Sequence, residues 1–340
     1  MSQKVRESNF ELLRIVAILF ITMHHLLING IDLCGYNCNF VLNLNSSIAV
    51  ILNSLIVGGV NLFLLISGWY GIKTITKGIV RLVVDCFFYG LIACLLSVLF
   101  VDAKLSVYDV FNSTKFTNGW FVPNYMYLLF LSPIIEYSLK NVSLRVLRYW
   151  IMLFFVCQVY FGYVLGFVDK NGYSAINFIF LYYIGRYLRY ELQNSKKTYQ
   201  IVGLVAWVLT GGTLGFVFLV ASRLGHPIES LRWWSYNNPL VLIGSISLFV
   251  YFSYLKIQKP WINYFATSVL GIYLVSSNSL ITEYRNNITQ KIFEMGAYPL
   301  LFAFAICLVL FVGSIILITN KVRQPVLNKI EKVFEKIIKI

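Results

Sequence analysis

Long apolar runs dominate this chain of 340 residues and limit the folds open to it. The hydrocarbon core of a bilayer is about 30 Å thick, so a helix that crosses it needs roughly 17–25 mostly apolar residues. The sequence is 59% hydrophobic and only 12% charged, whereas about 25% of the residues in soluble domains are charged. We therefore predict an all-α, polytopic membrane protein with about ten transmembrane helices. Their expected ranges are 9–28, 48–71, 79–101, 120–138, 146–166, 174–190, 200–221, 238–255, 263–281 and 298–319.

The Lys and Arg residues are distributed unevenly between these predicted spans. With the N-terminus in the cytoplasm, 20 of the 28 Lys and Arg residues fall on the cytoplasmic side and seven on the other side. Because the inner loops of membrane proteins carry such an excess, we expect both termini to be cytoplasmic. The chain is then a multi-pass protein of the cell (cytoplasmic) membrane. Its net charge of +14 reflects this topology and does not indicate a nucleic-acid partner.

The chain shows no internal repeat and no low-complexity linker, which favours a single transmembrane domain over residues 1–320. The basic segment 321–340 is expected to form a cytoplasmic amphipathic tail on the inner leaflet, with a solvated end as the alternative. The spacing of the six cysteines does not match a metal site, and we expect no metal. Cys34 and Cys38 share one loop, so a disulfide between them is possible if that loop faces an oxidising compartment, but their spacing alone does not decide whether they are bonded.

The first apolar run contains four ionisable side chains, namely Glu11, Arg14, His24 and His25. An ionisable group inside a membrane span is costly, so it usually faces a cavity and serves a function. On a helix, Arg14 and His25 differ in direction by only roughly 20° and lie roughly 16 Å apart along the axis. Glu11 lies about 60° from Arg14, whereas His24 is turned about 80° away from it. The run therefore predicts a polar stripe of Glu11, Arg14 and His25.

His25 is the residue of this stripe best suited to chemistry. Histidine titrates near neutral pH, so it can act as a general base that removes a proton from a hydroxyl attacking an acyl carbonyl. A proton relay or a hydrogen-bonded packing role is the alternative. The sequence has neither a Gly-x-Ser-x-Gly nucleophile elbow nor a phosphate-binding P-loop, which argues against a soluble hydrolase or an NTPase.

A second group of ionisable residues, Lys73, Lys77, Arg81 and Asp85, follows the second predicted span on the cytoplasmic side. Such a cationic cluster can bind a polyanion such as the phosphates of coenzyme A. Ordinary positive-inside anchoring, with Arg81 paired to Asp85 one turn later, is the alternative. A further polar cluster, at 273–278, interrupts an otherwise apolar run.

Four segments follow one another in an order that is informative as a set. The first is Ser-Asn-Phe-Glu-Leu-Leu-Arg at 8–14, followed by the His24-His25 pair, and the second is Gly-Val-Asn-Leu-Phe-Leu-Leu-Ile-Ser-Gly-Trp-Tyr at 59–70. The third and fourth lie at 120–133 and 180–189. Over about residues 8–320, this set resembles the acyltransferase 3 family of integral membrane enzymes, in the branch of bacterial surface-polysaccharide O-acetyltransferases.

The resemblance implies a membrane O-acyltransferase that moves an acyl group, expected to be acetyl, from cytoplasmic acetyl-CoA to an acceptor hydroxyl on the outer side. The implied acceptor is a surface polysaccharide or a lipid-linked glycan. The implied catalytic residues are His25 and Arg14, with Glu11 holding Arg14. The implied contacts to the acyl-CoA donor are Arg14, Arg81 and Lys77.

The chain departs from the family pattern at one position. Relatives commonly read Tyr-Leu-Ile-His-Asp/Glu-Asn where this chain reads Tyr-Leu-Val-Ser-Ser-Asn at 273–278, so Ser276 replaces a late histidine. We expect the histidine to be dispensable, because the polar stripe of the first span is intact. An altered acceptor or a reduced activity are the alternatives.

Two other functions could use the same residues. A glycolipid or polysaccharide transporter or flippase would use the polar stripe as a substrate or proton pathway. The paired broken helices typical of transporters are not visible in the sequence, which argues against it. A structural subunit of a glycan-assembly complex is the third alternative. Consumption of a thioester distinguishes the enzyme from both.

Overall fold

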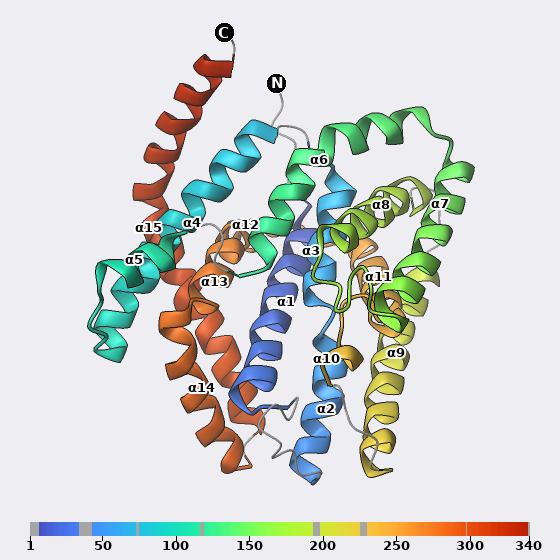
Figure 1. Cartoon of the computed structure of the whole chain (residues 1–340), viewed down its shortest axis with the longest axis horizontal. Helices are drawn as coiled ribbons and strands as arrows, with labels where there is room; N and C mark the ends of the chain where they lie inside the picture. Colours follow the sequence, from blue (N-terminus) through green and yellow to red (C-terminus); the bar gives the residue numbers. More distant parts are fainter. Residues whose placement is uncertain are drawn as a thin grey trace.

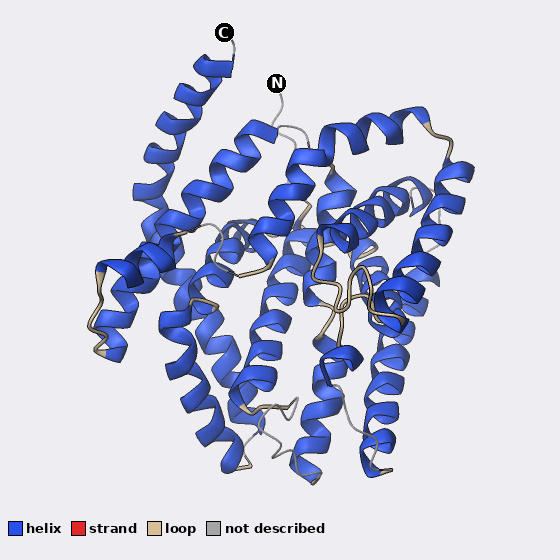
Figure 2. Ribbon diagram, in the orientation of Figure 1, coloured by secondary structure: helices blue, strands red, loops and turns tan. Residues whose placement is uncertain are grey.

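The computed structural model describes residues 7–33, 43–72, 75–115, 119–192, 198–224, 230–296 and 298–338. Within these ranges every regular element is a helix and no strand forms (Figure 2). The predicted all-α class is confirmed. Cys34 and Cys38 lie outside the described residues, so whether they are bonded stays open.

The helices form one bundle, in which segments far apart in the chain lie side by side (Figure 1). Several predicted spans are divided between two to four consecutive elements. In chain order the elements are α1 (Ser8–His25), η1 (Leu26–Gly30), α2 (Leu44–Ile56), α3 (Gly59–Tyr70), α4 (Ile75–Val101), α5 (Val107–Thr114), α6 (Phe121–Asn141), α7 (Leu144–Cys157), η2 (Gln158–Val164), α8 (Ala175–Glu191), α9 (Thr198–Arg223), α10 (Ser230–Trp233), α11 (Pro239–Ser253), α12 (Pro260–Phe265), η4 (Ala266–Ser268), α13 (Val269–Ser276), α14 (Ser279–Glu294) and α15 (Tyr298–Ile338).

All ten predicted ranges overlap helices, but the helices differ in their capacity to cross a bilayer. Among the described residues, six helical segments are long and apolar enough to do so, and a bent pair of helices makes a seventh. The protein is thus a helical membrane protein with six or seven supported crossings, and the number ten stays a prediction. The six segments are Ser8–Gly30, Leu44–Tyr70, Ile75–Val101, Leu144–Val164, Thr198–Arg223 and Pro299–Phe334.

The bent pair lies where the sequence predicts one span at 263–281. The segments Pro260–Ser276 and Ser279–Glu294 meet there at an angle of 87°. The amide of Ser277 donates to the carbonyl of Tyr273 and closes α13, while the side chain of Asn278 accepts from the amide of Leu280 and starts α14. Asn278, one of the polar residues that dilute this run, is therefore the N-cap of α14, and the backbone of Ser277 ends α13.

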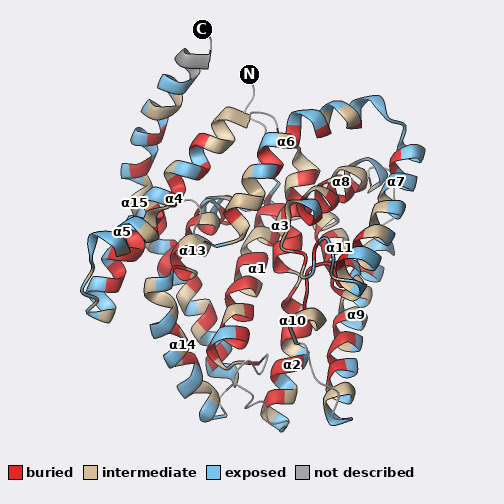
Figure 3. Ribbon diagram, in the orientation of Figure 1, coloured by how far each residue is buried: buried red, intermediate tan, exposed pale blue. Residues whose placement is uncertain are grey.

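α1 lies in the middle of the bundle and carries buried residues along its length (Figure 3). It contacts α2, α3, α11, α13 and α15. Phe10, Leu13, Ala17 and Ile18 are at most 2% exposed and form the face that packs against these neighbours. In a membrane this face is held by close van der Waals packing, because lipid tails are as apolar as leucine. By contrast, Trp150 and Leu153 of α7 are more than half exposed, as expected for side chains that face lipid.

Close packing of α3 against α8 depends on two glycines. A Cβ atom at Gly68 would lie 2.2 Å from the carbonyl oxygen of Tyr182, and one at Gly185 would lie 2.2 Å from that of Leu65. Any side chain at either position would push the two helices apart. This contact fixes α3, which presents Tyr70 to the start of α1.

α15 is a single helix of 41 residues, which corresponds to a length of about 60 Å at 1.5 Å per residue. That length is about twice the thickness of the hydrocarbon core, and the C-terminal part extends beyond the rest of the bundle (Figure 1). The helix has no break at residue 320, so the separate tail at 321–340 stays a prediction. The start of α1 and the end of α15 lie at the same end of the bundle (Figure 1). That this end is cytoplasmic also stays a prediction.

Candidate active site

The start of α1 holds an ion pair within one turn. Nη1 of Arg14 lies 3.1 Å from each carboxylate oxygen of Glu11. Glu11 is 4% exposed, whereas the side chain of Arg14 is 31% exposed. The Arg14 guanidinium also lies over the ring of Tyr70 from α3, 6.0 Å from its centroid. The structure therefore joins the first two members of the predicted stripe and leaves the arginine accessible to a ligand.

The other end of α1 carries His25, which is only partly buried. Its Nδ1 atom lies 3.5 Å from Oγ of Ser277, at the outer limit of a hydrogen bond. Ser277 stands between α13 and α14, at the 87° bend. The five residues after His25 form the π-helical turn η1, a geometry that is frequent at functional sites. His25 is thus placed where one helix changes its winding and another is broken.

His24 points to a different partner. Its Nδ1 atom lies 2.7 Å from Oδ1 of Asn53 on α2, and the side chain is 7% exposed. Nδ2 of Asn53 has no hydrogen-bond partner among the described residues. The two neighbouring histidines thus separate, as the helical arithmetic predicts: one is buried against an amide and the other remains accessible.

Arg285 on α14 completes the group around His25, and the sequence analysis missed it. It is 3% exposed, and its Nη1 donates to the carbonyl oxygen of Ser276 over 2.8 Å. Nε and Nη2 donate to Oδ1 of Asn286 over 3.3 and 3.0 Å. Because Ser276 precedes Ser277, whose Oγ lies 3.5 Å from Nδ1 of His25, the contact with the Ser276 carbonyl brings the guanidinium near the imidazole. Arg285 is one of the seven Lys and Arg residues that the topology assigns to the outer side, and its position two turns after the polar cluster at 273–278 was the one available signal.

A cavity of about 40 Å³ adjoins this group and reaches Ser277. The hydroxyl of Ser113 on α5 donates to the side-chain oxygen of Asn278 over 3.3 Å, which ties α5 to the same bend. The cavity provides space next to the hydroxyl that faces His25. It is lined by Cys86, Gly90, Ser113, Lys115, Gly119, Tyr273, Leu274, Ser277 and Asn278.

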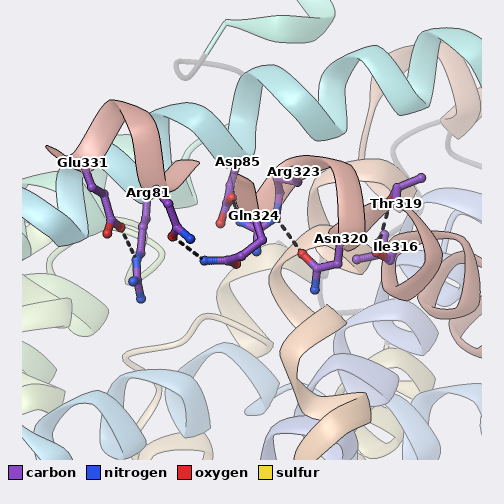
Figure 4. Close-up of polar contacts among 9 residues, drawn as sticks. Arg81, Asp85, Ile316, Thr319, Asn320, Arg323, Gln324 and Glu331 are labelled. Atoms are coloured by element: carbon purple, nitrogen blue, oxygen red, sulfur yellow. Dashed lines mark hydrogen bonds and ion pairs between the residues drawn. The ribbon is translucent and has the colours of Figure 1, made fainter. Parts of the chain in front are cut away.

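The two remaining predicted residues, Lys77 and Arg81, lie on α4, and Arg81 faces the C-terminal part of α15 (Figure 4). Nε of Arg81 lies 2.6 Å from a carboxylate oxygen of Glu331. Asp85 pairs with Arg323 of α15, so the alternative Arg81–Asp85 pair does not form (Figure 4). The side chain of Arg81 is 54% exposed. These contacts clasp α4 to α15, and a role in donor binding stays a prediction.

Taken together, α1 presents two polar sites, one at each end, on a single continuous helix. The first contains the Glu11–Arg14 ion pair, and the second contains His25 with Ser277 and Arg285. A cation that is open to ligand and an accessible imidazole, separated by about three helical turns, suit a reaction between a long donor and a hydroxyl acceptor.

Comparison with known proteins agrees with this arrangement. Searches of curated proteins and of solved structures find no match to this chain. A family model described as an acyltransferase domain matches residues 7–319, a range that includes both ends of α1 and the broken span. Because the match covers most of the sequence, the chain belongs to the acyltransferase 3 family of membrane acyltransferases.

Proposed function

We propose that this protein is a membrane O-acyltransferase. In this proposal it moves an acetyl group from cytoplasmic acetyl-CoA to a hydroxyl of an extracytoplasmic or lipid-linked polysaccharide in the cell envelope. Membership of the family supports acyl transfer in general. The observation that carries the proposal is the accessible His25 beside Ser277, on the same helix as the Glu11–Arg14 pair.

In the proposed reaction His25 acts as a general base through Nε2, while its Nδ1–H is oriented by the hydroxyl of Ser277. The imidazole takes the proton of the acceptor hydroxyl as that oxygen attacks the thioester carbonyl. The resulting tetrahedral intermediate collapses, the carbon–sulfur bond breaks, and the thiolate of CoA leaves and takes up a proton. The products are an O-acyl ester and free CoA, and the reaction requires no metal.

On the donor side, Arg14 is assigned to a phosphate or to the carbonyl oxygen of the thioester. Its partner Glu11 holds the guanidinium in place through two contacts of 3.1 Å. Arg81 and Lys77 are assigned to steering the anionic donor toward the bundle. Arg14 and His25 are separated by roughly 16 Å along α1, a distance that the extended pantetheine arm of CoA can bridge.

The test is turnover of the donor. The purified protein is given acetyl-CoA and a crude cell-envelope glycan extract, and release of free thiol is followed over time. We expect release that requires the glycan and is lost in His25→Ala. The matched control is His24→Gln, because glutamine can replace the hydrogen bond of His24 to Asn53. Equal activity of the two variants would contradict the role of His25 as the base.

A glycolipid or polysaccharide transporter is the second candidate, and the break between α13 and α14 favours it. Broken helices at the middle of a membrane are typical of transporters, in which they come in corresponding pairs. The described residues contain a single such pair, bent by 87°. Movement of a labelled glycolipid across vesicles without release of thiol would identify a transporter, and neither activity would indicate a structural subunit.

A further inference from the structure

Arg285 and Arg323 are the two buried arginines among the described residues, and they differ in their partners. Arg323, which is 9% exposed, forms an ion pair with Asp85. Arg285 is 3% exposed, and in the described part of the chain no carboxylate pairs with it. Its three hydrogen bonds to described residues go to neutral oxygens, namely the carbonyl of Ser276 and the amide side chain of Asn286. Burying a positive charge that has no carboxylate partner costs free energy, so we expect Arg285 to serve a role that offsets this cost.

The first role of Arg285 is geometric. The contact of Nη1 with the carbonyl of Ser276 spans the bend, because Arg285 belongs to α14 and Ser276 ends α13. A cation at the C-terminal end of a helix also interacts favourably with the helix dipole. α14 in turn packs tightly on η1, where a Cβ atom at Gly30 would lie 2.6 Å from the side chain of Thr289. Arg285 therefore helps to fix the position of Ser277 relative to His25.

The second role of Arg285 is electrostatic. The Arg285 guanidinium lies near the His25 imidazole, because the Ser276 carbonyl that it binds precedes Ser277, whose hydroxyl lies 3.5 Å from Nδ1 of His25. During acyl transfer, negative charge develops on the carbonyl oxygen of the thioester. A preorganised positive charge next to the reacting atoms stabilises that charge without rearrangement during the reaction.

We propose that Arg285 is a positioning residue of the acyl-transfer site: it holds the bend between α13 and α14 and supplies an uncompensated positive charge beside His25. This inference rests on the proposed acyltransferase function. A neutral environment for Arg285 is then a requirement of catalysis, and an acid placed next to it should be harmful even though it completes an ion pair.

Asn286 offers a direct test of the charge. Because its Oδ1 already accepts two hydrogen bonds from Arg285, Asn286→Asp adds a carboxylate with almost no change of shape. The variant keeps the arginine and its contacts but neutralises its charge. The matched control is Asn287→Asp, which adds the same charge at the next, exposed residue of α14. The assay is thiol release from acetyl-CoA with the glycan extract, with kcat and KM measured separately.

We expect Asn286→Asp to lower kcat at least 10-fold, with KM for acetyl-CoA unchanged and thermal stability equal to or above that of the wild type. Asn287→Asp should keep the kcat of the wild type.

A second pair of variants distinguishes the charge of Arg285 from its hydrogen bond. Arg285→Lys retains the charge, whereas Arg285→Gln retains a donor to the Ser276 carbonyl. We expect a loss of kcat of about 10²-fold in Arg285→Gln, and a clearly smaller loss in Arg285→Lys.

Two results would overturn the inference. One is an unchanged kcat in Asn286→Asp, which requires no folding control because full activity itself shows that the variant is folded. The other is an equal loss in Arg285→Lys and Arg285→Gln, which would assign Arg285 to structure alone. Failure of the proposed function is seen separately, because the wild type itself would then release no thiol with any short acyl-CoA.

Discussion

The two ends of α1 differ in whether the charges of their ionisable groups are paired. Near its start, a buried carboxylate and a partly exposed guanidinium form an ion pair, so the charge of each is balanced. Near its end, His24 and His25 face an amide and a hydroxyl, and the nearby Arg285 has neutral partners among the described residues. One helix therefore carries a balanced site and an unbalanced one, about three turns apart.

This difference separates two tasks. A balanced pair can be held permanently in a membrane at little cost, and its exposed member can bind an anionic ligand such as a phosphate. An unbalanced positive field around a neutral imidazole suits a step in which negative charge appears only during the reaction. In our proposal the first end of α1 binds the donor and the second end carries out the transfer.

The largest expected effect comes from removing the imidazole at the unbalanced end. We expect His25→Ala to lower kcat for acyl transfer about 10²–10⁴-fold, the usual contribution of a general base. Because His25 is only partly buried, the variant should fold, which size-exclusion chromatography in detergent can check. His24→Gln should remain within a few-fold of the wild type. Comparable losses in the two variants would remove the distinction between the histidines.

The next largest effect is expected from Arg14→Ala, which disrupts the ion pair at the balanced end of α1. Arg14→Ala removes the guanidinium that lies 3.1 Å from the carboxylate of Glu11, a residue that is 4% exposed. Breaking such a pair is expected to cost about 3 kcal/mol, at the low end of the range for buried pairs because Arg14 is partly exposed. The measurement is the thermal unfolding of the purified protein, in which the melting temperature should fall.

Glu11→Gln is the control for this prediction, because it removes the buried charge and leaves the partly exposed arginine in place. It should cost about 1 kcal/mol or less. An equal loss of stability in both variants would show that the pair acts through packing and not through charge. A rise in KM for acetyl-CoA in Arg14→Ala alone would support the assignment of Arg14 to the donor.

A smaller effect is expected from Ser277→Ala, which removes the hydroxyl that faces His25. The separation of 3.5 Å between Nδ1 of His25 and Oγ of Ser277 indicates a weak hydrogen bond. Losing this hydrogen bond should raise the activation free energy of acyl transfer by about 1 kcal/mol, which lowers kcat roughly 5-fold. Ser276→Ala is the matched control, because among the described residues the Ser276 hydroxyl donates to the carbonyl of Tyr273 in its own helix. A loss of 100-fold in Ser277→Ala would assign the serine a direct part in the chemistry.

The helices and the α1 stripe could be predicted because both depend on local pattern. Apolar runs mark the spans, and the constant turn of a helix places Glu11 near Arg14 and turns His24 away from His25. The bend at Ser277 could not be predicted in the same way. The polar residues at 273–278 were visible, but the same residues are compatible with a diluted span and with two capped helix ends.

Contacts between distant parts of the chain were beyond local reasoning. Arg285 reaches the His25 site only because the 87° bend directs α14 back along η1. Arg81 meets Glu331 across a separation of 250 residues, whereas the sequence suggested the neighbouring Asp85 as its partner. Pairing of charges in a helical bundle depends on which helices are adjacent, and spacing along one helix does not contain that information.

The smallest expected effect concerns Arg81, which extends the comparison from α1 to the clasp between α4 and α15. Because the Arg81 side chain is 54% exposed, Arg81→Ala should change stability by less than about 1 kcal/mol. If Arg81 steers the donor, this variant should raise KM for acetyl-CoA a few-fold at low salt and less at high salt. Glu331→Gln releases Arg81 from its acid and should leave KM equal or lower it. A parallel rise of KM in both variants would mean that the clasp itself, and not the free charge of Arg81, supports donor binding.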